Sequence, residues 1–160
     1  MNLRRATEDD AAQACAVIRR SIAELCVADH GGDAAHIAKW LSNKTVENVT
    51  RWISQTYVVV AEDGGSIIGV AAMTDAGKVT LNYVSPDARF RGVSKALMRA
   101  IEDHARALGL AQCSLETSQT ALRFYDSLGY RPTGQTYTLP LTGSPATVLS
   151  KRIAPPTSAA

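Results

Sequence analysis

The sequence predicts an α/β fold in which a mixed, mostly antiparallel sheet is flanked by helices. β-Branched and aromatic runs between residues 57 and 84 are separated by short glycine-containing turns, which is typical of antiparallel strands. Residues 11–25 and 92–108 instead place apolar side chains three or four positions apart, as one buried helix face requires. Extended and helical patterns then alternate from residue 112 onward.

The size and composition fit one globular domain. The 160 residues correspond to about one domain of ~150 residues. Lys and Arg number 17 against 15 Asp and Glu, and the resulting charge of +2 is too small to indicate nucleic acid or an acidic membrane as the main partner. A hydrophobic content of 46% excludes global disorder. We expect a single domain over 1–153 and a disordered tail over 154–160, which lacks periodicity.

The cysteine content and the N-terminus predict a cytoplasmic protein. Cys15, Cys26 and Cys113 are an odd number without a C-x-x-C pair, which argues against a disulfide framework and a structural zinc site. Residues 1–10 carry charges without a following apolar core, so they do not read as a secretory signal. No apolar stretch approaches the roughly 20 residues that cross a bilayer. The sequence does not determine the oligomeric state, and a homodimer is one of the alternatives.

Helices dominate the first third of the predicted fold. Residues 2–5 form a short strand, and Thr7 then caps a helix whose first acids face the positive end of the dipole. Glycines within 28–33 end this helix, Asp33 caps a second one and Thr45 a third. The buried stripe of the first helix comprises Ala11, Cys15, Ile18, Ile22 and Leu25.

A meander of three strands follows. Residues 57–61 and 67–73 are β-branched or apolar, and the glycines at 64–65 join them as a hairpin. A third strand covers 79–84 and stops before Pro86, because proline cannot donate to a ladder.

The remaining elements alternate. Gly92 opens a long helix that ends at Gly109. A strand is predicted over 112–117, a helix over 120–128, a strand from Tyr130 and a last strand over 147–153.

The stretch 84–97 is the most informative for function, since it reads as a strand, a basic glycine-containing turn and a helix. Gly92 allows close backbone approach, and Arg89, Arg91 and Lys95 add positive charge beside the unpaired N–H groups of the helix start. Such a turn can hold a diphosphate, although a solvated basic helix start is the alternative. The spacings of the nucleotide-hydrolase and dinucleotide-binding glycine motifs are absent.

Two motifs identify a resemblance. Residues 89–94 read R-F-R-G-V-S and match R/Q-x-x-G-x-G/A, with Ser94 where glycine or alanine is usual. Residues 121–130 match A-x-x-F-Y-x-x-x-G-[FY]. With both motifs in this order, the chain resembles the GNAT superfamily of acetyl-CoA-dependent N-acetyltransferases. The resemblance covers nearly the whole chain in element order and is weak for 29–54, which in such folds shapes the acceptor pocket.

The resemblance implies a sheet splayed between the strands that end at Val84 and Thr117, with the pantetheine arm of acetyl-CoA in the gap. Tyr83 and Val84 would hydrogen-bond this arm, and Ser118, in the second block, would contact the cofactor as well. The pyrophosphate would be bound by N–H groups of Arg91, Gly92, Val93, Ser94 and Lys95, with charge added by Arg89.

The implied reaction is direct transfer of the acetyl group to a primary amine of a small molecule or a peptide. An N–H near Val84 would stabilise the oxyanion. Tyr125, with a reference pKa of ~10, stands where the family has a proton donor for the CoA thiolate, whose pKa is ~8.5. The alternative for Tyr125 is a core tyrosine on its helix stripe.

An amine acceptor with a pKa of ~10.4 must lose a proton before it attacks, so a base is needed. Glu116 is charged within an otherwise apolar strand and is a candidate base, with a structural hydrogen-bond acceptor as the equal alternative. Asn82 could instead hold a water. Cys113 is disfavoured as an acyl nucleophile, since it starts a buried strand. Further candidates on the front helices are Glu24, Asp29, His30 and His36.

A second class of function fits the same motifs. A non-catalytic, CoA-binding regulatory module would keep the cofactor cleft without turnover. Thiol release from acetyl-CoA in the presence of amines separates this module from the enzyme.

Overall fold

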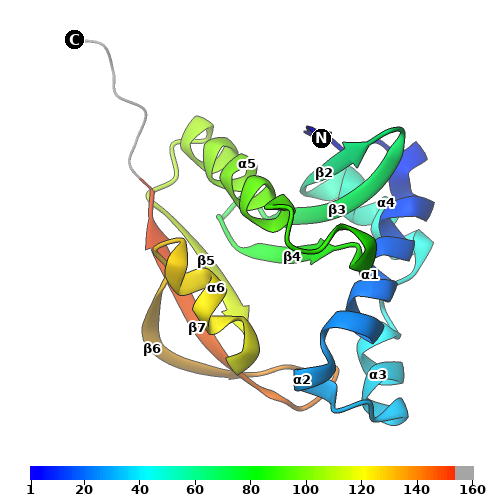
Figure 1. The fold of residues 1–160 in the computed structure, drawn as a ribbon. Coiled ribbons are helices and arrows are strands. Elements are labelled where there is room, and N and C mark those ends of the chain that lie inside the picture. Colours follow the sequence, from blue (N-terminus) through cyan, green and yellow to red (C-terminus); the bar gives the residue numbers. More distant parts are fainter. Residues whose placement is uncertain (154–160) are drawn as a thin grey trace.

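The computed structural model describes residues 1–153, so the tail predicted over 154–160 lies outside the described residues. Seven strands in this part of the chain form two antiparallel sheets (Figure 1). The first sheet has the order β1-β2-β3-β4, with β1 (Asn2–Arg5), β2 (Tyr57–Asp63), β3 (Ser66–Met73) and β4 (Val79–Val84). The second has the order β5-β7-β6, with β5 (Gln112–Thr117), β6 (Arg131–Thr138) and β7 (Pro145–Arg152).

The helices lie close to where the sequence predicts them. They are α1 (Ala11–Leu25), α2 (Val27–His30), α3 (Ala34–Leu41), α4 (Val46–Gln55), α5 (Val93–Ala107) and α6 (Leu122–Ser127), with short 3-10 turns η1 (Glu8–Asp10), η2 (Pro86–Ala88) and η3 (Gln119–Ala121). The caps predicted at Asp33 and Thr45 are confirmed, because the Asp33 side chain accepts from two N–H groups of α3 and the Thr45 side chain from one of α4. Within residues 1–153, none of the helices has the length and apolar character that a bilayer span requires.

Three helix boundaries differ from the prediction. The break expected over 28–33 begins with the short helix α2, which ends at Gly31 in the left-handed conformation. Thr7 precedes the 3-10 turn η1 rather than α1, and its N–H donates to the Asp10 carboxylate. The helix expected over 120–128 begins as the 3-10 turn η3, so α6 is shorter. Local propensity sets which segments are helical, whereas packing of the ends sets where each helix begins.

The two sheets meet where β4 and β5 run parallel. One bridge joins Lys78 to Ser114, and the Ser114 N–H donates to the Gly77 carbonyl at 2.9 Å. Gly77 has φ 90°, and a Cβ there would lie 2.7 Å from the carbonyl oxygen of Gln112, so this junction requires glycine. Within the described residues no further pair joins the strands, which therefore form the predicted splay. The predicted mixed character of the sheet rests on this single parallel contact.

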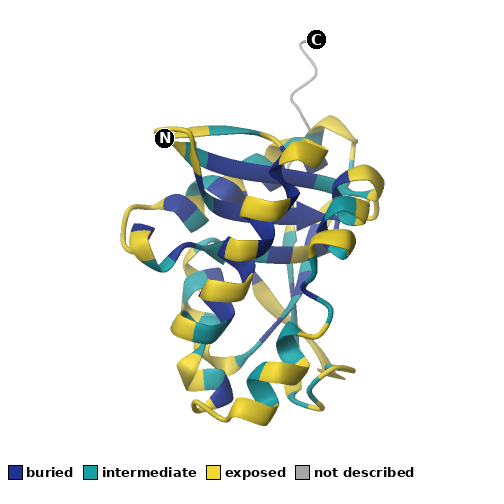
Figure 2. Ribbon diagram, turned by 90° about the vertical axis from the view of Figure 1, so that its right-hand side faces the viewer, coloured by how far each residue is buried: buried dark blue, intermediate teal, exposed yellow. Residues whose placement is uncertain are grey.

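The first sheet is buried on both faces, and Figure 2 shows its strands in dark blue behind helices with exposed outer turns. Val58 and Val60 of β2 pack toward α1 and α4, whereas Val59 packs toward α5. A bulge between Ala72 and Met73 shifts the register of β4. Val79 and Leu81 therefore enter opposite cores, although residues two apart normally share a face. Asn82, the residue after Leu81, is therefore turned toward α5 and α6.

Candidate functional site

A hollow with a cavity volume of about 290 Å³ lies between the end of β4, the turn before α5, and α6. Gly92 caps α5 with φ 74°, a left-handed conformation that favours glycine. The Ala96 N–H bonds back to the Gly92 carbonyl at 3.1 Å, so the earlier N–H groups of the turn face outward. The hollow is lined by Val84, Ala88, Arg89, Phe90, Gly92, Val93, Ser94, Lys95 and Phe124.

Two of the three predicted cations line this hollow. The guanidinium of Arg89 lies 4.7 Å from the ring centroid of Phe90, which is 92% exposed and has φ 63°. Lys95 is exposed at the first turn of α5. Arg91 instead donates to the Asp63 carboxylate at 2.6 Å, and this contact lowers the pKa of Asp63. Free N–H groups, a glycine and two cations fit a diphosphate.

The edge of β4 offers backbone groups to the splay, but not those of Tyr83. The Ser85 N–H donates to the Ile68 carbonyl of β3 at 2.8 Å. Because alternate residues of an antiparallel strand bond to the partner, Tyr83, opposite Val70, also faces β3. The backbone of Val84 points the other way, into the splay. The expectation that Tyr83 holds a ligand through its backbone is therefore corrected, since β3 already uses those groups.

Tyr125 lies at the centre of a hydrogen-bonded group beside the hollow. Its hydroxyl accepts from the Asn82 Nδ2 at 3.1 Å, and the Ser94 hydroxyl donates to the Asn82 Oδ1 at 2.9 Å. Burial raises the pKa of Tyr125, although the bond from Asn82 opposes this shift. The phenol, only 8% exposed, therefore keeps its proton at neutral pH. Each end of the Asn82 amide makes one hydrogen bond within the protein, which leaves one N–H and one lone pair, so a water held by Asn82 stays a prediction.

Glu116 lies on the opposite face of the second sheet from Tyr125. Its strand neighbours Cys113 and Leu115 are buried in the core beneath α5, so the alternation of β5 turns Glu116 away from that core. The carboxylate pairs with the Lys78 Nζ at 2.8 Å and its side chain is 20% exposed. The ion pair gives Glu116 a structural role, which is the alternative to a catalytic base that the sequence left open.

The other candidate bases and nucleophiles have partners within the protein. The His30 Nε2 lies 2.8 Å from the Ile22 carbonyl and its Nδ1 accepts from the Gly32 N–H. Asp29 accepts from the Thr120 hydroxyl at 2.6 Å. Cys113 is fully buried, and burial raises the pKa of its thiol to about 11. Glu24 pairs with Arg20, and His36 packs against Trp40.

Some of the predicted cofactor-binding residues do not line the hollow, and some residues that line it were not predicted from the sequence. Ser118 precedes η3 at the end of β5, across the splay from Val84, and is not among the lining residues. Phe124 lines the hollow, and its place in the second motif, next to Tyr125, was the available signal. Ala88 and Phe90 also line it; Phe90 had no signal beyond lying inside the basic turn.

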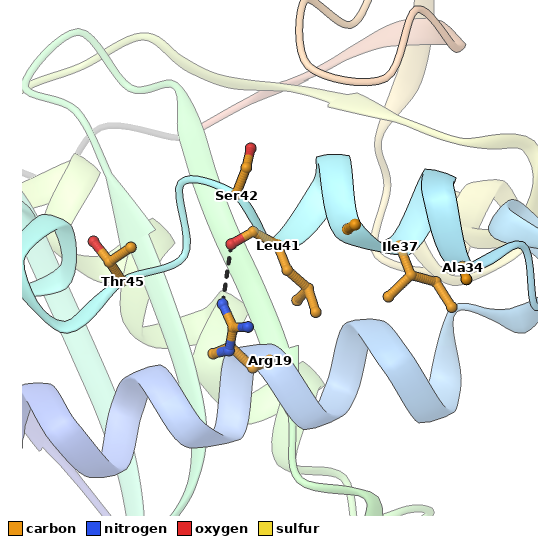
Figure 3. A pocket seen from close by; sticks show the side chains of 7 residues that line it. Arg19, Ala34, Ile37, Leu41, Ser42 and Thr45 are labelled. Carbon is orange, nitrogen blue, oxygen red and sulfur yellow. Dashed lines mark hydrogen bonds between the residues drawn. The ribbon is translucent and has the colours of Figure 1, made fainter.

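A larger hollow, with a cavity volume of about 590 Å³, lies between α1 and α3 (Figure 3). Its walls are mostly apolar, with Ile37 and Leu41 contributed by α3. The one charged lining residue, Arg19, donates to the Leu41 carbonyl at 3.0 Å and thereby ties α1 to the end of α3. This hollow shares no lining residue with the first one, and none of the predicted catalytic or cofactor-binding residues lines it.

The family comparison agrees with this geometry. Residues 25–138 match the model of the acetyltransferase (GNAT) domain. The amino-acid acetyltransferase of Azotobacter vinelandii is 35% identical over 99 residues, which are 59% of this chain and 22% of that protein. N-acetyltransferase 8F1 of Rattus norvegicus is 33% identical over 90 residues, which are 49% of this chain and 41% of that protein. The chain thus spans less than half the length of these relatives.

Solved structures agree over almost the whole chain. The GCN5-related N-acetyltransferase from Rhodopseudomonas palustris superposes with a TM-score of 0.86 and 25% identity over 94% of each chain. The PaiA N-acetyltransferase from Thermoplasma acidophilum, in complex with coenzyme A, has a TM-score of 0.77 and 15% identity, over 94% of this chain and 98% of that one, and shares the fold. The family model matches most of the sequence, and the structure has the splayed sheet. The chain therefore belongs to the GNAT acetyltransferase family.

Proposed function

We propose that this protein is an N-acetyltransferase that moves the acetyl group of acetyl-CoA to a primary amine by direct attack. The observation that carries the proposal is the Tyr125 hydroxyl, buried, protonated and held by Asn82 beside the hollow at the start of α5. Family membership supports acetyl transfer over a module that only binds CoA. The acceptor is an amine of a small molecule or a peptide.

The residues of the hollow would hold acetyl-CoA, which supplies an activated thioester. The first N–H groups of α5, with Arg89 and Lys95, would bind the diphosphate. The edge of β4 near Val84 would bind the pantetheine arm through backbone groups. The PaiA protein, which has the same fold, is solved in complex with coenzyme A, and this supports coenzyme A as the kind of ligand.

The chain's own groups then act at two points of the transfer. The lone pair of the amine forms a C–N bond to the thioester carbon, and the Val84 N–H would stabilise the negative charge on the carbonyl oxygen. The C–S bond breaks as that oxygen re-forms its double bond. The sulfur takes the proton of Tyr125, and the surplus proton of the amine leaves to a base. Proton exchange with solvent restores Tyr125.

We assign the base to Glu116. The amine nitrogen and the departing sulfur are separate substituents of the tetrahedral intermediate, and each needs its own proton-transfer partner. Glu116 lies on the face of the second sheet opposite Tyr125, so the base and the proton donor would act on different groups. Glu116→Gln should lower kcat about 10²-fold at neutral pH, with partial recovery as rising pH deprotonates the amine in solution. Glu8→Gln, at an exposed glutamate that is not a candidate base, is the matched control. An unchanged rate and pH profile in Glu116→Gln would leave deprotonation to solvent.

Binding and turnover together test the proposed function. Calorimetry with acetyl-CoA should show binding, and thiol release should appear with at least one member of a panel of polyamines, aminoglycosides, amino acids and peptides. Gly92→Val should weaken acetyl-CoA binding, because a branched residue at φ 74° distorts the turn. Gly109→Val, also at φ 74° in open space near the other end of α5, is the matched control. Binding without thiol release for every amine would favour the regulatory module.

A further inference from the structure

Ser94 makes a side-chain contact that the diphosphate site does not require. The GNAT motif has glycine or alanine at this position, whereas Ser94 here donates to the Asn82 Oδ1 at 2.9 Å. Its backbone N–H belongs to the first turn of α5, which lines the hollow. One residue thus joins the anion site, through its backbone, to the amide that holds Tyr125, through its side chain.

The direction of these hydrogen bonds decides what Tyr125 can do. Since the Ser94 hydroxyl donates to Oδ1, the amide of Asn82 turns its Nδ2 toward the Tyr125 hydroxyl, 3.1 Å away. A hydroxyl that accepts this bond still has its own proton to give. If the amide were reversed, Tyr125 would donate to Oδ1 and its proton would be engaged inside the protein.

Three separate elements bring this group together. Ser94 is on α5, Asn82 on β4 and Tyr125 on α6. The bulge between Ala72 and Met73 turns Asn82 toward the two helices. Ser94 lines the hollow, whereas Asn82 and Tyr125 are not among its lining residues, so the hydrogen-bonded group extends from the wall of the hollow into the protein.

We propose that Ser94 and Asn82 are positioning residues for acetyl transfer, which orient the Tyr125 hydroxyl so that its proton is reserved for the departing sulfur. This inference rests on the proposed acetyl transfer. It adds that Ser94, which stands where the family motif has glycine or alanine, fixes the direction of the hydrogen bond between Asn82 and Tyr125.

Asn82→Asp tests the direction of the bonds. A carboxylate accepts from both Ser94 and Tyr125, so the tyrosine proton becomes engaged and kcat should fall about 10²-fold, with the Kd for acetyl-CoA within about twofold. Thr80→Asp adds the same charge at the exposed bulge position of β4 and should keep the wild-type rate. A wild-type rate in Asn82→Asp would show that Tyr125 already donates to the amide, which overturns the proposal.

Ser94→Ala tests whether the serine acts through Tyr125. The expected loss in kcat is about tenfold, and Ser94→Thr, which keeps the hydroxyl, should recover most of it. In the Tyr125→Phe background, Ser94→Ala should cause no further loss, because its target is gone. Ser54→Ala, an exposed helix serine, is the control. Full speed in Ser94→Ala, or a loss of equal size in both backgrounds, would overturn the positioning role.

A spectroscopic measurement reads the same contacts without turnover. The Cζ resonance of ¹³C-labelled Tyr125, assigned with Tyr125→Phe, reports its titration. Because the bond from Asn82 lowers the pKa of Tyr125, Asn82→Leu should raise it, and Ser94→Ala should raise it less. An unchanged titration in both variants would overturn the inference. A wild-type protein that releases no thiol with any amine would overturn the proposed function, and with it the positioning role.

Discussion

Two tyrosines beneath α5 use their hydroxyl groups in opposite ways. Tyr130 donates to the Glu102 Oε2 at 3.1 Å, whereas Tyr125 accepts from the Asn82 Nδ2. Their ring centroids are only 5.8 Å apart. The Glu102 carboxylate is also bound by the Lys151 Nζ at 2.7 Å, so α5 and β7 are joined by a buried ionic cluster.

The difference separates a structural polar group from a chemical one. The Glu102 carboxylate accepts from the Tyr130 hydroxyl and from the Lys151 ammonium, which is what a buried charge requires. Burial, together with the Glu102 charge, raises the pKa of Tyr130, so this phenol stays a donor to the carboxylate. Around Tyr125 the partners are neutral, and the phenol proton is left unused next to a hollow. Burial alone therefore does not distinguish a catalytic tyrosine from a structural one. The distinguishing feature is a hydroxyl proton that is not donated to another group of the protein.

Replacing each tyrosine by phenylalanine tests the comparison most strongly. Tyr125→Phe should lower kcat about 10²-fold, since a hydrogen bond to sulfur is strongest as the C–S bond breaks. Tyr130→Phe should keep kcat within about twofold and lower the free energy of unfolding by about 1 kcal/mol. Thiol release and urea denaturation on both variants give the two readouts. Equal losses of rate would remove the distinction.

Lys151→Met should break the ionic cluster. The variant removes the nearer of two cations from the buried Glu102 carboxylate and leaves Arg106, whose Nη2 lies 3.8 Å from the Glu102 Oε1. We expect a loss of about 2 kcal/mol in the free energy of unfolding, below the range for fully buried pairs because Lys151 is partly exposed and Arg106 remains. The rate of thiol release at 25 °C should be unchanged. Arg152→Met, on an exposed neighbour, is the control. A stability equal to that of the wild type would show that the pair contributes nothing.

Lys44 offers the opposite case, a buried lysine that no carboxylate pairs with among residues 1–153. Burial lowers the pKa of Lys44 from 10.5 to about 8. Below pH 8 the folded protein therefore holds a disfavoured charge, and this cost disappears as the pH rises from 8 to 10.5. Lys44→Met should raise the free energy of unfolding by about 1 kcal/mol at pH 7 and by less at pH 10. Urea denaturation at both pH values checks this; a destabilised variant at pH 7 would show that its bond to the Trp40 carbonyl outweighs the burial cost.

The smallest effect is expected at the exposed ion pair before α5. Asp63→Asn should release Arg91 toward the hollow and tighten acetyl-CoA binding about threefold, an effect that salt should screen. Asp103→Asn, which releases Arg106 on the far part of α5, is the control. Calorimetry at low and high salt measures both. Weaker binding in Asp63→Asn would show that the Asp63 contact positions the turn.

Much of the fold, and the basic turn before α5, follow from short-range sequence features. Capping residues such as Asp33 and Thr45, and the glycines of the turns, act within a few residues and therefore predicted the helices and the hairpin. The basic turn from Arg89 to Lys95 was recognisable because its N–H groups, glycine and cations are contiguous. The boundaries of α2 and α6 depend on what the helix ends contact, which no local pattern contains.

The roles of individual groups required the tertiary structure, because they depend on partners far apart in the chain. Sequence alone determined that Tyr125 is a candidate proton donor and Glu116 a charged residue in an apolar strand. Only the structure decided that a bulge in β4 turns Asn82 toward Tyr125, 43 residues away, and that Lys78 partners Glu116. A hydrogen bond depends on distance and direction in space, and a shift of one residue in strand register reverses the face on which a side chain lies.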